Sequence, residues 1–74
     1  MNTGMMWLDT DSKLSLDEKI RRAAEYYQQK YGQQPDTCLV NKVMLAAEKR
    51  VDMIEVHPAR NVLPNHFWVG MKGS

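Results

Sequence analysis

The sequence contains a single cysteine among its 74 residues, so no disulfide can form within the chain. A lone Cys38 fits a reducing compartment, where thiols stay free. The glycines are isolated, at positions 4, 32, 70 and 73, which excludes a glycine-rich phosphate-binding loop. No apolar run approaches the roughly 20 residues of a membrane-spanning helix, and the N-terminal segment lacks the pattern of a signal peptide. We therefore expect a cytoplasmic protein with no membrane contact.

The sequence also lacks an excess of charge, because 10 basic residues stand against 9 acidic ones. The net charge of +1 gives no electrostatic reason to expect nucleic acid or a membrane surface as a partner. No spacing of residues matches a catalytic motif, and no pair of carboxylates can be assigned to a cleft. We therefore expect a protein that is not an enzyme and has no cofactor.

The length allows one small domain, which we place at residues 5–72, with residues 1–4 and 73–74 disordered. A chain this short buries a modest share of its surface, so its margin of stability is thin. Nevertheless, 43% of its residues are hydrophobic, including six Met and two Trp. This combination predicts self-association, with the protein working through protein–protein contact as a homodimer or an accessory subunit.

The only long periodic segment predicts a helix over residues 16–31. Ser15 followed by Glu18 has the spacing of a capping box, and Gly32 can adopt the left-handed conformation that ends a helix. One side of this helix carries an apolar stripe of the width expected for a core-facing helix. Its members are Leu16, Ile20, Ala23, Ala24, Tyr27 and Tyr31.

The rest of the chain has short β-rich runs separated by turn residues. We predict strands over residues 5–8, 37–40, 53–57 and 66–71, and a short second helix over residues 42–48 that Asn41 caps. The run over residues 37–40 is continuously apolar, which is typical of a central strand covered on both faces. The last two strands are expected to be antiparallel neighbours, with Pro58 ending the first of them. The predicted fold is a small α/β (α+β) domain, in which a three- to four-stranded mixed sheet has the long helix packed on one face.

Two histidines flank the loop between the last two predicted strands. His57 and His66 could join Cys38 or Glu55 in a three-ligand metal site. Their spacing matches no standard metal-binding pattern, and Cys38 falls in a predicted core strand, where a free cysteine is normally inert. We therefore expect neither a metal site nor a cysteine nucleophile.

The residues expected to make protein contact lie at both ends of the chain. Tryptophan and arginine are favoured anchors of interfaces, and the loop over residues 58–65 is stiffened by two prolines and rich in hydrogen-bonding groups. The predicted contact residues are Trp7, Arg60, His66, Trp68 and Met71.

A nucleic-acid interface is the alternative. Six basic residues, together with Trp7, Tyr26 or Trp68, could present the mixed aromatic and basic surface that binds single strands. These are Lys19, Arg21, Arg22, Lys49, Arg50 and Arg60. Acidic residues interleave with them, and Glu18 and Arg22 have the spacing of an ordinary helix ion pair. A solvated charged surface is therefore the preferred interpretation, and we do not expect nucleic acid as a partner.

Two segments resemble a piece of the major coat proteins of tailed phages. The first is PDTCLVN (residues 35–41), which follows a helix, and the second runs from IEVHP (54–58) through Leu63-Pro64 to FWVG (67–70). In that family a helix precedes a strand with an Asn-Pro-like end and a short helix, and two strands separated by a proline follow. The similarity covers about residues 20–71 and departs from the family at Lys42, where a proline is expected. It implies a topology, and no functional residue is carried over from it. The alternative function stays a nucleic-acid-binding accessory protein, related to a phage or mobile element.

Overall fold

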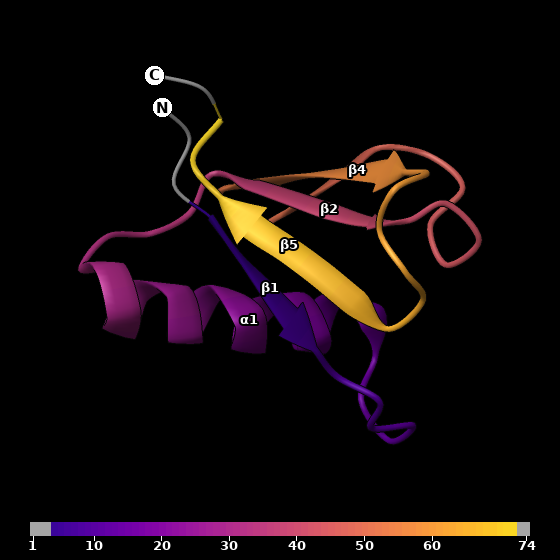
Figure 1. The fold of residues 1–74 in the computed structure, drawn as a ribbon, viewed down its shortest axis with the longest axis horizontal. Coiled ribbons are helices and arrows are strands. Elements are labelled where there is room, and N and C mark those ends of the chain that lie inside the picture. The colour runs from indigo at the N-terminus through magenta and orange to yellow at the C-terminus, as the bar shows by residue number, and fades with distance from the viewer. Residues whose placement is uncertain (1–3, 73–74) are drawn as a thin grey trace.

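The computed structural model describes residues 4–72, which form one helix and a five-stranded sheet (Figure 1). The elements in chain order are β1 (Gly4–Leu8), α1 (Leu16–Tyr31), β2 (Thr37–Asn41), β3 (Lys49–Val51), β4 (Ile54–Ala59) and β5 (His66–Gly70). The predicted mixed α+β class is confirmed, but the sheet has one or two more strands than expected. Gly4 belongs to β1, and the disorder expected for residues 1–3 and 73–74 lies outside the described residues.

Helix α1 has the bounds that its sequence predicts. The Glu18 N–H donates to Ser15 Oγ at 3.1 Å, and the Glu18 carboxylate accepts from the Ser15 N–H, which completes the capping box. Gly32 ends the helix at a φ of 78°. The predicted apolar stripe is buried at Ile20, Ala23, Ala24 and Tyr27, while Leu16 packs at its border and Tyr31 is exposed.

The strand order in the sheet is β1-β5-β2-β4-β3. β2 runs parallel to β4, and the other neighbouring pairs are antiparallel. β2 is therefore the middle strand, as its apolar sequence predicts. The helix covers only one of its faces, so Cys38 and Val40 are fully buried while Leu39 is partly exposed.

Two predictions about the last strands are wrong. β4 and β5 are not neighbours, because β2 lies between them and pairs with both. Pro58 does not end β4, which continues to Ala59. β3 pairs only with residues 54–56, so the outer side of β4 is a free edge at Pro58, and a free edge tolerates a residue without an N–H.

The predicted second helix over residues 42–48 is also wrong. Asn41 does cap a turn, because its Oδ1 accepts from the Val43 N–H and its carbonyl accepts from Met44 and Leu45. The helical pattern then stops, Leu45 is buried, and the chain returns as β3 along β4. Residues 45–48 instead lead into β3, which pairs with β4 just beyond the predicted helix.

The core lies between α1 and one face of the sheet. Its fully buried side chains include Ile20 and Tyr27 from the helix, together with Val56 from β4 and Phe67 and Val69 from β5. Within residues 4–72, no helix is both long and apolar enough to cross a membrane.

Candidate interaction surface

The sheet has two faces with different surroundings. α1 covers the face that carries Cys38, Val56 and Phe67, and the alternation of side chains along each strand assigns the other residues to the opposite face. No helix covers this opposite face within the described part of the chain (Figure 1). We call it the open face. Its residues include Met6, Leu8, Leu39, Arg50, Glu55, His57, His66 and Trp68.

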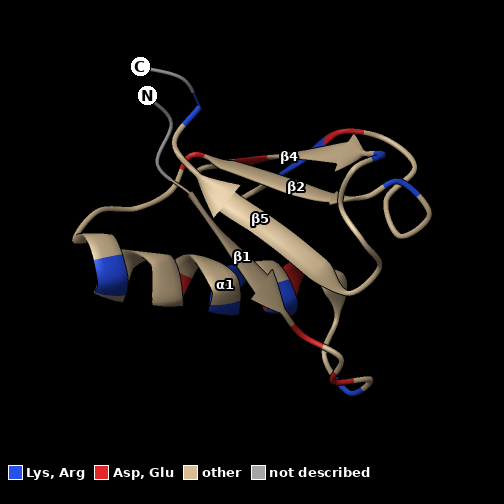
Figure 2. Cartoon of the chain, in the orientation of Figure 1, with Lys and Arg blue, Asp and Glu red and all other residues tan. Residues whose placement is uncertain are grey.

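One half of the open face is mostly apolar, with His66 opposite Leu8 at its end. Met6 and Leu39 stand directly opposite Trp68 on its two neighbouring strands, which gives a row across β1, β5 and β2. The Trp68 ring lies over Gly4, where any Cβ would overlap it. Met6 is 52% exposed and Leu8 is 56% exposed. We call Met6, Leu8, Leu39 and Trp68 the open-face patch, and β1, β5 and β2 carry no Asp, Glu, Lys or Arg beneath it (Figure 2).

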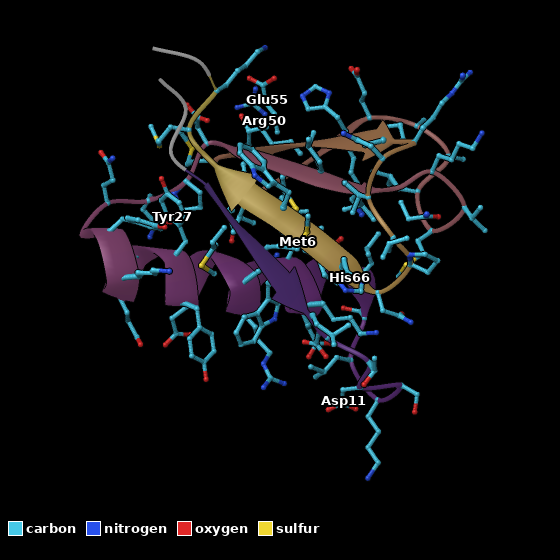
Figure 3. All side chains as sticks on the ribbon, viewed as in Figure 1. Met6, Asp11, Tyr27, Arg50, Glu55 and His66 are labelled. Atoms are coloured by element: carbon cyan, nitrogen blue, oxygen red, sulfur yellow. The ribbon has the colours of Figure 1, made fainter. Side chains whose placement is uncertain are left out.

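The other half of the open face is charged. His57 continues the row beside Leu39, with its Nδ1 3.0 Å from Glu48 Oε2 and its Nε2 3.5 Å from Glu55 Oε1. Arg50 stands opposite Glu55, and both lie at the β3–β4 end of the sheet in Figure 3, away from Met6 and His66. This half holds one imidazole between two carboxylates, and Lys72 Nζ lies 3.9 Å from Glu55 Oε1. It therefore carries charges of both signs.

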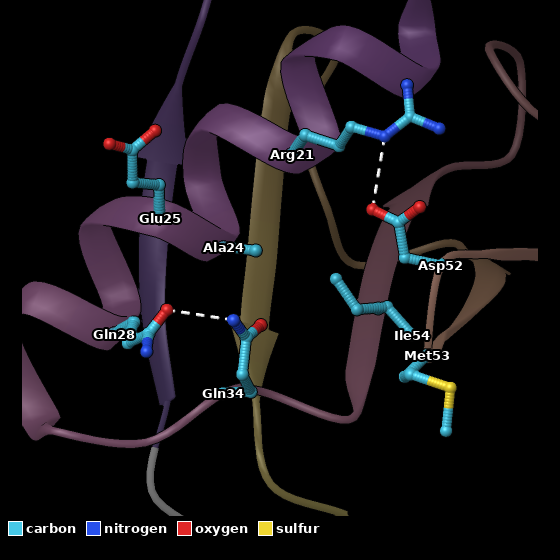
Figure 4. A pocket seen from close by; sticks show the side chains of 8 residues that line it. All are labelled: Arg21, Ala24, Glu25, Gln28, Gln34, Asp52, Met53 and Ile54. Carbon is cyan, nitrogen blue, oxygen red and sulfur yellow. Dashed lines mark hydrogen bonds and ion pairs between the residues drawn. The ribbon is translucent and has the colours of Figure 1, made fainter.

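A groove of about 520 Å³ separates α1 from the turn between β3 and β4 (Figure 4). Ala24 and Ile54 line its apolar part. The Arg21 Nε donates to Asp52 Oδ2 at 3.1 Å across it, and this hydrogen bond and charge raise the pKa of Arg21. Gln34 Nε2 donates to Gln28 Oε1 at 2.8 Å at another point of the lining. The lining residues include no histidine, cysteine or hydroxyl side chain, and one of the two carboxylates in the lining, that of Asp52, is paired with Arg21.

The predicted contact residues do not form one surface. Trp68 and His66 lie on the open face, and His66 Nδ1 is 2.9 Å from the carbonyl oxygen of Pro64. Trp7 faces α1 and stacks on Tyr26, with 4.2 Å between the ring centroids.

The other two predicted contact residues are also separated from the open face. Met71 packs against the core, and Arg60 is exposed in the loop after β4. The set therefore divides between the open face, the helix side and the loop.

The predicted contact set omits Met6, Leu8 and Leu39. Met6 and Leu8 alternate with Met5 and Trp7, which pack against the core, so a period of two along β1 is the signal for them. Leu39 has no such signal, because its strand is apolar at consecutive positions. Only the position of α1 determines which face of β2 is exposed.

The two histidines and the cysteine do not converge. His57 and His66 share the open face but lie on β4 and β5, with β2 between them, and Cys38 faces the opposite side under α1. Burial raises the pKa of the Cys38 thiol to about 12, so the thiol is protonated and unreactive at neutral pH. No group of three His, Cys, Asp or Glu side chains within residues 4–72 has an arrangement that could hold a metal ion.

The basic residues are dispersed as well. Lys19 is only 8% exposed, Arg21 is paired with Asp52, and Lys49 Nζ lies 2.6 Å from Asp17 Oδ1. Basic and acidic positions alternate along α1 in Figure 2. The nucleic-acid alternative stays a prediction, without a continuous basic surface on α1 to support it.

Comparison of the chain with protein-family models, with curated proteins and with solved structures found no match. The resemblance to phage coat proteins therefore stays a prediction.

Proposed function

We propose that this protein is a non-enzymatic interaction module that self-associates through the side of the open-face patch that β1 forms. The observation that supports the proposal is the exposure of Met6 and Leu8 beside Trp68 and Leu39, on a face that no helix of residues 4–72 covers. Contiguous apolar surface with a polar border is typical of protein contact sites. His57, Glu55 and Arg50 supply that border.

A second copy of the chain is the partner that best matches this patch. The patch has no charge to pair with a charged partner, and a small domain gains stability when a partner covers part of its exposed apolar surface. The cytoplasm is the proposed location, since Cys38 is free and buried.

Sedimentation equilibrium or light scattering at tens to hundreds of micromolar tests the proposal. The wild type is expected to shift with concentration from 8.6 kDa towards twice that mass. Met6→Lys and Leu8→Lys should each remain monomeric, because a charge then has to leave water for an apolar contact. Both side chains are more than half exposed, so neither lysine should unfold the chain.

Met53→Lys is the matched control for these variants. Met53 is 78% exposed in the turn between β3 and β4, away from the open-face patch. This variant should associate as the wild type does. A wild-type protein that is monomeric at the highest concentration would contradict the proposal, and so would equal association of all three variants.

A further inference from the structure

The two edges of the sheet differ in how they are protected. β3 forms one edge and presents Lys49 and Arg50, both exposed. β1 (Gly4–Leu8) forms the other edge and contains no charged residue and no proline. Charged residues, prolines and bulges are the usual features that keep an edge strand from pairing with another chain. Only the β3 edge has such a feature among its strand residues.

The backbone N–H and C=O groups of successive residues in β1 point alternately towards β5 and towards the free edge. The Asp9 N–H donates to the carbonyl of Asn65 at 2.9 Å, just beyond the end of the β1–β5 ladder. In an antiparallel ladder every second residue bonds to the same neighbour, so Met5 and Trp7 bond to β5. The N–H and C=O groups of Gly4, Met6 and Leu8 then point away from the sheet and are available to another strand.

Apolar side chains border this free edge on both sides of the sheet. Met6 and Leu8 stand on the open face. On the helix side, Trp7 stacks on Tyr26, a residue that is 47% exposed. A strand added at this edge would therefore gain backbone hydrogen bonds and apolar contacts together.

We propose that a second copy of the chain adds its β1 to this edge, antiparallel and centred on Met6, to give a continuous ten-stranded sheet. This inference rests on the proposed self-association and specifies its geometry. The contact is isologous, so each strand offers the other the same groups. Centring on Met6 pairs every residue of β1: Gly4 lies opposite the partner's Leu8, Met5 opposite the partner's Trp7, and Met6 opposite the partner's Met6.

Centres nearer the C-terminal end of β1 are less favourable. Moving the two-fold axis from Met6 to Trp7 or Leu8 leaves Gly4 and Met5 unpaired and brings the carboxylate of Asp9 into the contact region. Gly4 also has a specific role in the proposed register. Its missing Cβ leaves room for the Trp68 ring, against which the partner's Leu8 would pack.

A cysteine at position 6 tests the register directly. In Met6→Cys the two introduced thiols would stand in a hydrogen-bonded antiparallel pair, with Cα atoms about 5.5 Å apart, which is within the range for a disulfide. Mild oxidation should convert most of this variant into a covalent dimer. Met53→Cys, on the turn beside the opposite edge, should stay uncrosslinked. The buried Cys38 should not interfere, since it is fully inaccessible in the folded chain.

Leu39→Lys distinguishes edge pairing from packing of two open faces against each other. Leu39 lies two strands away from β1, so edge pairing should persist in this variant. A dimer that Leu39→Lys abolishes and that Met6→Cys does not crosslink would overturn the edge geometry while leaving self-association intact. A wild type that stays monomeric throughout would overturn both proposals. Circular dichroism of each variant confirms that it is folded.

Discussion

Cys38 illustrates how one buried position limits the chemistry of the molecule. Its side chain is fully inaccessible on the central strand β2, and burial raises the pKa of its thiol to about 12. A thiol protonated at neutral pH is a poor nucleophile and a poor metal ligand. Cys38 therefore acts as a small apolar residue of the core, as the apolar run around it predicts.

The same burial makes folding sensitive to alkaline pH. The pKa of Cys38 rises from 9.0 in the unfolded chain to about 12 in the folded one, so the folded state holds its proton more tightly. The contribution of the protonated thiol to the free energy of unfolding is complete below pH 9, and it is lost as pH rises towards 12. Urea unfolding from pH 8 upward should show that the free energy of unfolding declines with pH. This decline should be smaller in Cys38→Ala than in the wild type, by up to about 4 kcal/mol over the whole range.

Some alkaline loss should remain in Cys38→Ala. Burial also raises the pKa of Tyr27, so this residue contributes in the same direction. The test therefore compares how the free energy of unfolding falls with pH in the wild type and in Cys38→Ala. The stability of either protein at one pH does not decide it. Identical curves for the wild type and the variant would contradict the burial argument.

At the residue scale, the sequence predicts whether a side chain lies in a strand better than it predicts which face of the sheet that side chain occupies. Trp7 and Trp68 both lie in short β-rich runs, yet Trp7 faces α1 and Trp68 faces the opposite side. The alternation along β5 places Trp68 on one face of the sheet and Phe67 and Val69 on the other. It does not predict which of these two faces the helix covers. That choice is made by packing between segments far apart in the chain.

Helix α1 is the element that local sequence determines most fully. Its capping box, its apolar stripe and its glycine end all act within a few residues, so the predicted bounds agree with the structure. A contact with a distant strand, the pairing of Lys49 with Asp17, adds to these local signals without being needed to define the helix.

The capping box leads to a test of this local control. Ser15→Ala removes the oxygen that accepts from the Glu18 N–H at 3.1 Å, and should lower the free energy of unfolding by about 1 kcal/mol. Ser15→Asp should keep most of the stability, because a carboxylate accepts the same hydrogen bond near the positive end of the helix dipole. Ser12→Ala, outside the box, is the matched control. Thermal or urea unfolding measures the stability of all three variants. A Ser15→Ala variant as stable as the wild type would contradict the role of the cap.

The strand order could not be predicted in the same way. A local reading places the last two strands beside each other because sequential strands are usually neighbours. β2 instead occupies the position between β4 and β5, and the short β3, for which no strand was predicted, forms beside β4 just after the predicted second helix. β3 has only Lys49, Arg50 and Val51, and such a short, charged run becomes a strand only through its pairing.

At the scale of the whole molecule, charge and apolar surface occupy different regions. The strands β1, β5 and β2 contain no Asp, Glu, Lys or Arg, whereas β3 carries two basic residues, β4 carries one acidic residue, and α1 holds charges of both signs (Figure 2). The two functions considered for this chain therefore use different regions, the apolar strands for self-association and the basic residues of α1 for nucleic acid. They also respond oppositely to salt.

Salt dependence therefore separates the two. Contact between uncharged β1 surfaces should hold or tighten when salt rises from about 50 to about 500 mM, because screening removes nothing and apolar burial is favoured at high ionic strength. Binding to single-stranded nucleic acid through phosphate contacts would instead fall steeply over the same range. Sedimentation of the protein alone and titration with a fluorescent oligonucleotide measure the two effects. We expect a salt-resistant dimer and no oligonucleotide binding at low salt. A dimer that dissociates as salt rises would mean that His57, Glu55 and Arg50, and not the apolar edge, form the contact.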